Sequence, residues 1–207
     1  MYTDAVKLDA GCWGLGAERS GLRLGALLLA VPLGQPAPTA EAFFAGGCFW
    51  GVEAVFEHVR GVQSVTSGFA RYGDPVAVEA VRIVYDPSRI GYRQLLEVFF
   101  AVAHDPTTRD RQGPDIGPEY RAVVLYQDPV ERDVASTLVA GLVKAGRFKQ
   151  PIVTELRQLS TFTVAEAYHQ DYGARHPTDP YILRNDAPKL AHLRESFPAL
   201  YQEHRSQ

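Results

Sequence analysis

A cysteine placed between glycines and large aromatic side chains is the first feature of this sequence that indicates chemistry. The segment FFAGGCFWGVEAVF covers residues 43–56, and Cys48 lies in it between a Gly-Gly pair and Phe49-Trp50. Glycines let the backbone turn sharply and let a substrate approach closely, and the two aromatic rings would form an apolar wall beside the sulfur. At the first turn of a helix, unpaired N–H groups and the helix dipole should favour a thiolate. Cys48 is therefore either a reactive nucleophile or, as many free cysteines are, a small buried hydrophobe.

A carboxyl group inside an apolar strand is the second feature. In VEAVRIVYD, residues 78–86, Glu79 shares one strand face with Val81, Ile83 and Tyr85. A carboxyl group on a buried face tends to keep its proton and can then donate it to a developing oxyanion. The alternative is that this face meets solvent and Glu79 has no chemical role.

Histidine and metal chemistry receive little support. His104, His169 and His176 each fit an ordinary core or surface position, and no segment has the local pattern of a cysteine protease. The two cysteines, Cys12 and Cys48, are too few for a disulfide framework, and no Cys/His cluster has the spacing of a zinc site. We therefore expect no bound metal.

The composition is that of an ordinary globular protein. The chain has 207 residues, 46% hydrophobic and 22% charged, with a net charge of −3 and a pI near 6.1. This length allows one domain with a sizeable core. The slightly acidic balance argues against a nucleic-acid groove or a polybasic membrane surface.

The N-terminal part differs from the rest of the chain. Residues 22–40, LRLGALLLAVPLGQPAPTA, place an apolar run too short to span a bilayer before prolines and small residues, an order that resembles a secretory signal peptide. We expect a leader over 1–40, which would carry Cys12, and a catalytic domain over 41–207. With a true leader the protein would be periplasmic or secreted; with a disordered extension or a misplaced start codon it would be cytoplasmic.

The remaining sequence mixes strand and helix patterns. Period-2 and period-3.6 spacing predict strands over 41–45, 62–69, 78–86, 120–127 and 152–160, and helices over 48–59, 92–104, 129–145, from 163 to about Gly173, and 188–196. Residues 104–119 read as a long loop, and loops of that length are commonly functional. Some strand pairs are joined too closely for a helical crossover. We therefore expect an α+β fold with one mostly antiparallel mixed sheet and helices packed on it.

Four segments in unbroken order resemble the peptide methionine-S-sulfoxide reductases, the MsrA family. They are GGCFWGVEAVFEHVRGVQSVTSGFA, VEAVRIVYDP, HDPTTRDRQGPDIGPEYRAVVLY and AEAYHQDY, and the match runs from about Phe43 to Tyr172. The resemblance implies a ferredoxin-like two-layer sandwich. It also implies that Cys48 attacks the sulfoxide sulfur, that Glu79 protonates the sulfoxide oxygen, and that Tyr120 belongs to the polar side of the pocket.

The resemblance further implies how the substrate is held and how Cys48 is returned to its reduced form. Phe49 and Trp50 would hold the substrate methyl group, and Asp115 would complete the polar side. The substrate would be the S epimer of methionine sulfoxide, in oxidised proteins or free, and oxygen transfer would leave Cys48 as a sulfenic acid. We expect no bound cofactor, an external thiol such as a thioredoxin-like protein or a small thiol as reductant, no nucleic acid, no stable membrane span, and a monomer.

Three departures from the family pattern leave alternatives open. The segment from Arg71 to Val78 is short and lacks the family's pocket tyrosine, for which Tyr72 is the nearest candidate, and Ala77 stands where a histidine is expected. No cysteine follows Cys48, so no resolving cysteine is available from that part of the chain. A non-catalytic binder of oxidised methionine, and a thiol peroxidase or redox sensor, are the competing hypotheses.

Overall fold

The structure is a computed structural model and describes residues 38–203. The expected leader falls outside the described residues except for its last three positions, and Cys12 lies outside them as well. Among residues 38–203, the structure contains no helix with the length and hydrophobicity of a membrane-spanning segment.

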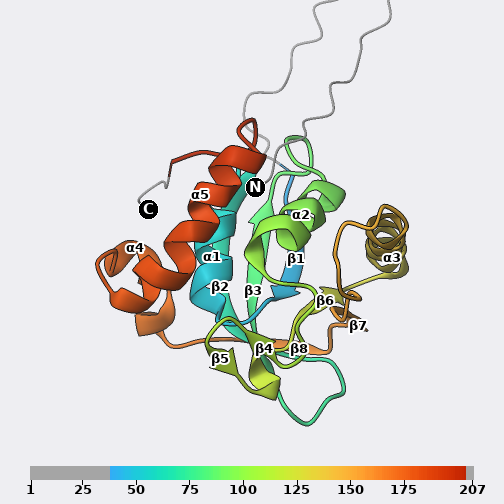
Figure 1. The fold of residues 1–207 in the computed structure, drawn as a ribbon, viewed down its shortest axis with the longest axis horizontal. Helices are drawn as coiled ribbons and strands as arrows, with labels where there is room; N and C mark the ends of the chain where they lie inside the picture. Colours follow the sequence, from blue (N-terminus) through green and yellow to red (C-terminus); the bar gives the residue numbers. More distant parts are fainter. Residues whose placement is uncertain (1–37, 204–207) are drawn as a thin grey trace, which may run out of the picture. The chain divides into compact units, whose positions relative to one another are not determined.

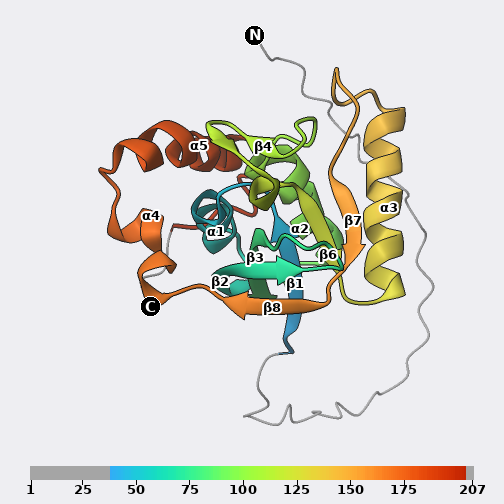
Figure 2. The same ribbon diagram turned by 90° about the horizontal axis from the view of Figure 1, so that it is seen from below.

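Six strands form the main sheet in the order β7-β6-β1-β3-β2-β8, and two more form a small hairpin (Figures 1 and 2). Their bounds are β1 Ala40–Ala45, β2 Val62–Arg71, β3 Val78–Tyr85, β6 Val123–Tyr126, β7 Glu155–Gln158 and β8 Thr161–Val164, with β4 Arg111–Gln112 and β5 Asp115–Ile116 in the hairpin. Every pairing is antiparallel except that of β6 with β7. The expectation of a mostly antiparallel mixed sheet is confirmed.

The sheet curls strongly, so that its edge strand β8 reaches back over β1. Phe162 on β8 and Phe43 on β1 are three strands apart, which would separate them by about 14 Å in a flat sheet. Their ring centroids are instead 5.4 Å apart. Gly68 permits this approach, because a Cβ atom there would lie 2.4 Å from the Phe162 ring. The sheet is therefore a half-barrel, with a small apolar cluster inside the curl.

Helices cover the other face of the sheet. They are α1 Phe49–Glu57, α2 Tyr92–Val98 continuing as a π-helical turn over Phe99–Ala103, α3 Pro129–Lys144, α4 Tyr172–Arg175 and α5 Ala187–Ser196, with a second π-helical turn over Ile182–Asp186 and 3₁₀ turns over Pro118–Tyr120 and Ala167–His169. Asp128 caps α3 by accepting from the Glu131 N–H, and Pro129 occupies its first turn, as the sequence pattern indicates.

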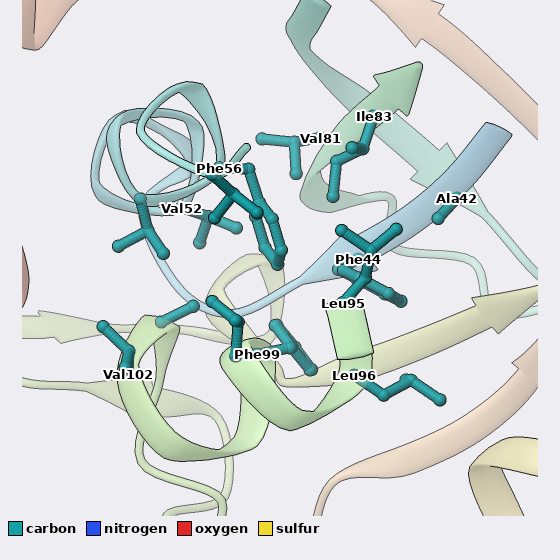
Figure 3. Close-up of a cluster of buried hydrophobic side chains, with 14 of the residues drawn as sticks. Ala42, Phe44, Val52, Phe56, Val81, Ile83, Leu95, Leu96, Phe99 and Val102 are labelled. Atoms are coloured by element: carbon teal, nitrogen blue, oxygen red, sulfur yellow. The ribbon is translucent and has the colours of Figure 1, made fainter. Parts of the chain in front are cut away.

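The main core lies between this face and the helices. Figure 3 shows side chains from β1, β3, α1 and the α2 region meeting there, among them Phe44, Phe56 and Phe99. Phe44 is fully buried, and its ring lies 4.8 Å from Phe99 and 5.5 Å from Phe56. This packing holds β1 against α1, and the junction between those two elements is where Cys48 lies.

Two sequence expectations need correction. The helix expected from 163 to about Gly173 is wrong: Thr161–Val164 is strand β8, and only short turns follow it. Its alternating β-branched residues pair with the free edge of β2, which outweighs the helical spacing. The loop expected over 104–119 contains the β4-β5 hairpin and a 3₁₀ turn.

The α+β class is confirmed, whereas a two-layer ferredoxin-like sandwich is not established. Strands β7 and β8 extend the sheet at its two edges, β7 in parallel orientation, and the sheet curls instead of lying as a flat layer.

We expect Phe44→Ala to lower the free energy of unfolding by about 3 to 5 kcal/mol, because it leaves a cavity between β1 and the helices. Urea unfolding followed by circular dichroism measures this. Val143→Ala on the exposed side of α3 is the control and should change the free energy by less than about 0.5 kcal/mol. Equal effects of the two substitutions would contradict this assignment of the core.

Candidate active site

Cys48 lies where the backbone turns from β1 into α1, as the sequence indicates. It is the residue that immediately precedes the first helical turn of α1, and it is partly buried. The turn depends on Gly47, whose φ of +87° is disfavoured for residues with a side chain. A Cβ atom at Gly47 would also lie 2.4 Å from Gln112, which packs over the turn. The glycine before the thiol is thus required both by its conformation and by the close approach of Gln112.

The environment of the thiol does not favour a thiolate in the resting protein. Burial is the largest effect on Cys48 and raises the pKa of its thiol to about 12, and the negative charge of Glu79 adds to the rise. Hydrogen bonds from the Trp50 backbone and the Tyr181 hydroxyl lower the pKa but do not offset burial. The contribution expected from the start of the helix is thus present, in the Trp50 N–H, but loss of solvation outweighs it and the net pKa is raised.

Glu79 lies beside the thiol because of the sheet register. Phe44 on β1 pairs with Val81 on β3, so Glu79 falls two residues further on, at the end of the sheet where β1 leads into Cys48. Its carboxyl oxygen accepts a hydrogen bond from the backbone N–H of Phe49 at 3.0 Å. Burial raises the pKa of Glu79 to about 7, and the charges of Asp115 and Glu119 add to the rise. Glu79 can thus carry a proton near neutral pH, in agreement with its expected behaviour on an apolar strand.

Asp115 and Tyr120 come from the segment between α2 and β6. Asp115 is on β5, and its carboxyl group accepts a hydrogen bond from the Tyr181 hydroxyl at 2.5 Å. Tyr120 ends a 3₁₀ turn; burial and the charges of Glu79, Asp115 and Cys48 raise its pKa to about 12. Both residues therefore belong to the neighbourhood of the thiol, with the Tyr120 hydroxyl protonated and able to donate.

Phe49 and Trp50 follow the thiol on α1 but differ in exposure. Phe49 is 2% exposed and packs edge-on against Phe69 at 5.7 Å. Trp50 is partly buried; its ring stacks on Tyr172 at 3.8 Å and lies at 85° to the Tyr181 ring. Rings of the C-terminal segment thus pack against Trp50, whereas Phe49 is enclosed in the core.

A cavity of about 260 Å³ opens next to Cys48 on the side of the β4-β5 hairpin. Its lining includes His104, Gln112, Asp115, Tyr181 and Lys189. His104 is a structural residue, because its two ring nitrogens bond Phe99 and Thr154 and burial lowers its pKa to about 4. In the described residues no group of His, Cys, Asp and Glu side chains could hold a metal ion.

Tyr72 does not reach this site through any of its contacts. Its hydroxyl accepts from Arg121 at 3.4 Å, and its ring packs on the apolar cluster inside the curl. Arg121 also binds Asp74 at 3.1 Å and Asp110 at 2.6 Å, which ties the short segment after β2 to the loop that carries Asp115.

Tyr181 is the site residue that sequence reasoning missed. It lies in the C-terminal segment, which carries no recognisable motif, and the structure brings it to both Asp115 and Cys48. A tyrosine in HPTDPY has no spacing that indicates chemistry, so only the fold reveals it.

Comparison with known proteins agrees with this geometry. The family model described as peptide methionine sulfoxide reductase matches residues 40–200. A peptide methionine sulfoxide reductase MsrA 2 of Mesorhizobium japonicum is 45% identical over 82% of this chain and 93% of its own length, and an MsrA of Natronomonas pharaonis is 44% identical over 77% and 96%.

Solved structures are similar as well. Methionine sulfoxide reductase A of Corynebacterium diphtheriae superposes with a TM-score of 0.57 and 30% identity, over 70% of this chain and 77% of that one. Mxr1 of Saccharomyces cerevisiae in reduced form gives a TM-score of 0.60 and 25% identity, over 70% and 89%. The family model and the curated relatives match most of the chain, and the structure places the Cys48 thiol and the Glu79 acid close together. This chain therefore belongs to the peptide methionine sulfoxide reductase family.

Proposed function

We propose that this peptide-methionine (S)-S-oxide reductase works through Cys48 as the nucleophile and Glu79 as the acid. The observation that carries the assignment is the hydrogen bond from the Phe49 N–H to the Glu79 carboxyl group, which fixes an acid with a pKa of about 7 beside the residue that follows the thiol. A sulfoxide has an apolar methyl group on one side and a polar S–O group on the other. It therefore needs an acid and an apolar surface that both face the thiol.

The Glu79 carboxyl group and the Cys48 thiol titrate as a coupled pair. Between about pH 7 and pH 12 the pair of Glu79 and Cys48 holds a single proton, which rests on the thiol. Moving that proton to Glu79 produces a thiolate and a carboxylic acid together, which is the combination that attack on a sulfoxide requires. A high resting thiol pKa is thus compatible with nucleophilic attack once substrate fills the site.

The reaction balances without any cofactor. The Cys48 thiolate attacks the sulfoxide sulfur and forms an Sγ–S bond, while Glu79 gives its proton to the sulfoxide oxygen. The S–O bond of the substrate then breaks, the hydroxyl group passes to Sγ, and the Sγ–S bond breaks to release the thioether. Methionine sulfoxide is reduced by two electrons to methionine, and Cys48 is oxidised by two, to a sulfenic acid that keeps the proton. The Tyr120 hydroxyl supplies a hydrogen-bond donor for the oxygen, whereas the Tyr181 hydroxyl donates to Asp115 and orients that carboxyl group beside the thiol, and Trp50 faces the methyl group.

The sulfenic acid is then reduced by an external thiol. One thiol condenses with it to give a mixed disulfide and water, and a second thiol releases Cys48 as a disulfide forms between the two reductant sulfurs. The absence of any cysteine after Cys48 supports this route. A thioredoxin-like protein or a small thiol would serve.

The central part of the sheet has the strand order of a ferredoxin-like unit. Strands β6-β1-β3-β2 are antiparallel throughout, and α1 and α2 connect β1 to β2 and β3 to β6. That order and connection favour a ferredoxin-like unit at the centre of the half-barrel.

The full chain, with excess dithiothreitol, should consume the S epimer of N-acetyl-methionine sulfoxide and leave the R epimer. Chromatographic separation of product and both epimers measures this. Cys48→Ser should abolish turnover, and Glu79→Gln should lower kcat by about 10²- to 10⁴-fold because it removes the transferable proton. Binding of the S epimer without turnover would establish a non-catalytic binder, and faster oxidation of Cys48 by peroxide than by sulfoxide would indicate a peroxidase.

The resting thiol should react slowly with alkylating agents. Since its pKa is raised to about 12, the thiolate fraction at pH 8 is small and grows as pH rises through 9 and beyond. We expect iodoacetamide to label Cys48 in the folded protein at least about tenfold more slowly than in urea, with a rate that still increases above pH 9. Peptide mass spectrometry separates Cys48 from Cys12. A labelling rate that levels off below pH 8 would show a stabilised thiolate instead.

A further inference from the structure

The Arg121 side chain, which directly follows Tyr120 in the chain, pairs with acids from three separate segments. Its guanidinium group lies 2.6 Å from Asp110, 3.1 Å from Asp74 and 3.8 Å from Glu155. The side chain is only 18% exposed, so solvent screens these contacts less than it screens those of a surface ion pair. The reaction proposed above makes no use of this residue.

The bond to Asp110 closes the loop that carries Asp115 and Tyr120. Asp110 precedes the β4-β5 hairpin and Arg121 follows the 3₁₀ turn after it, so the two side chains join the ends of the loop. The Asp110 carbonyl group also accepts from the Gly117 N–H at 3.0 Å. Asp110 has a φ of +49°, which a non-glycine residue adopts only where its surroundings hold it. Backbone and side chain therefore both hold the loop closed.

The bond to Asp74 joins this loop to the short segment that leads into β3. Asp74 lies shortly before Glu79, and its other carboxyl oxygen accepts from the Val76 N–H at 3.0 Å. The Tyr72 hydroxyl accepts from the same guanidinium group at 3.4 Å. Figure 1 shows the turn between β2 and β3 at the same end of the molecule as the β4-β5 hairpin. Arg121 thus connects the segment before the acid to the loop that carries its polar neighbours.

The charges around Arg121 balance. Glu155 on β7 also bonds Arg157 at 2.7 Å and lies 4.0 Å from Arg109, so three arginines face three acids. Partly buried ion pairs contribute little net stability, because the cost of desolvation offsets their attraction. A planar guanidinium fork does, however, hold two acids in one fixed geometry. The arrangement is therefore better suited to fixing segments relative to one another than to stabilising the fold.

The position of the loop acts on Glu79. After burial, the charges of Asp115 and Glu119 raise the pKa of Glu79, and both of these acids lie in the loop. Cys48 at the start of α1 and Tyr120 in the loop are further ionisable groups beside it, and the β2 residue that pairs with Glu79 carries no charge. A displaced loop would therefore change both the hydrogen bonding and the protonation of the site.

We propose that Arg121 is a positioning residue for catalysis: it ties the loop that carries Asp115 and Tyr120 to the segment that leads into Glu79. The inference rests on the proposed function, because it assumes that Glu79 and Tyr120 act on the sulfoxide oxygen. Arg121 acts through these residues and does not itself contact the reacting atoms. The short segment after β2 thereby has a role in the site, although Tyr72 does not reach the thiol.

Steady-state kinetics with the S epimer of N-acetyl-methionine sulfoxide tests the proposal. Arg121→Met removes all of the bonds, Arg121→Lys keeps the charge without the fork, and Arg132→Met on the exposed side of α3 is the control. The external thiol acts after oxygen transfer, so kcat/KM for the sulfoxide does not depend on it. Arg121→Met should lower kcat/KM by about tenfold to hundredfold, because Tyr120 and Asp115 lose their fixed position. Arg121→Lys should recover part of this loss, and Arg132→Met should match the parent.

The pH dependence of kcat/KM separates positioning from simple loss of a charge. In the parent, kcat/KM should rise through about pH 7, as Glu79 loses a proton and its pair with Cys48 comes to hold a single one. If the loop moves away in Arg121→Met, Asp115 and Glu119 no longer raise the pKa of Glu79, and the rise shifts to lower pH. Loss of the cation with the loop in place would shift it to higher pH, because a nearby cation lowers the pKa of a carboxyl group. An unshifted rise, or a shift to higher pH, would overturn the proposal.

Exchange of amide hydrogens in the loop, followed by NMR, tests the link independently of activity. Gly117 and Tyr120 donate within the loop at 3.0 and 3.1 Å, so the exchange of their amide hydrogens reports its opening. Asp74→Ala acts directly only on the segment before β3, yet it should make both amides exchange about threefold faster, and Arg121→Met should make them exchange about tenfold faster. Arg132→Met should leave both rates unchanged.

Unchanged exchange in Asp74→Ala would contradict the proposal, because the two segments would then be independent. The Asp74 side chain is 29% exposed, so this comparison holds even if Arg121→Met fails to fold. If the parent consumes no sulfoxide, the proposed function fails, and the exchange rates then decide the positioning role alone.

Discussion

The backbone N–H of Phe49 donates to the Glu79 carboxyl group at 3.0 Å, and the arrangement of the site depends on this bond. It satisfies one of the unpaired N–H groups at the start of α1 with an acid from β3, so the same contact caps the helix and places a proton source beside the thiol. The sheet register that pairs Phe44 with Val81 makes the contact possible, and the core around Phe44 keeps that register. The position of Glu79 beside the thiol and the packing around Phe44 therefore depend on the same strand pairing.

Desolvation governs the chemistry of the groups that gather there. Burial is the largest cause of the raised pKa at Cys48, Glu79, Tyr120 and Tyr181 alike. Loss of solvation therefore disfavours charge on each of these groups, which suits a neutral sulfoxide better than a charged ligand. In the mechanism proposed above, Glu79 and Cys48 share one proton above about pH 7, so its transfer forms the thiolate and the carboxylic acid together. A separately stabilised thiolate, which the helix N-terminus suggested, is not needed.

Local sequence patterns predicted the strands and helices whose formation depends mainly on residues close together in the sequence. The strand that carries Glu79, the helix after Cys48 and the capped helix α3 all follow from periodicity and end signals. The error at Thr161–Val164 arose because a strand edge on β2, contributed by residues far away in sequence, was available for pairing. The curl of the sheet escaped prediction for a similar reason, since it depends on Phe162 crossing over Gly68 to reach Phe43.

The site likewise contains residues that the sequence reveals and residues that only the fold reveals. Cys48 and Glu79 stand out in sequence because a thiol between glycines and an acid in an apolar strand are locally unusual. Tyr181 and Tyr172 do not stand out, since their roles arise only when the C-terminal segment folds back over α1. That return places an Asp115-bound hydroxyl against the thiol and an aromatic ring behind Trp50. No cysteine follows Cys48 in this sequence, so the C-terminal segment contributes structure and hydrogen bonding to the site but no second thiol.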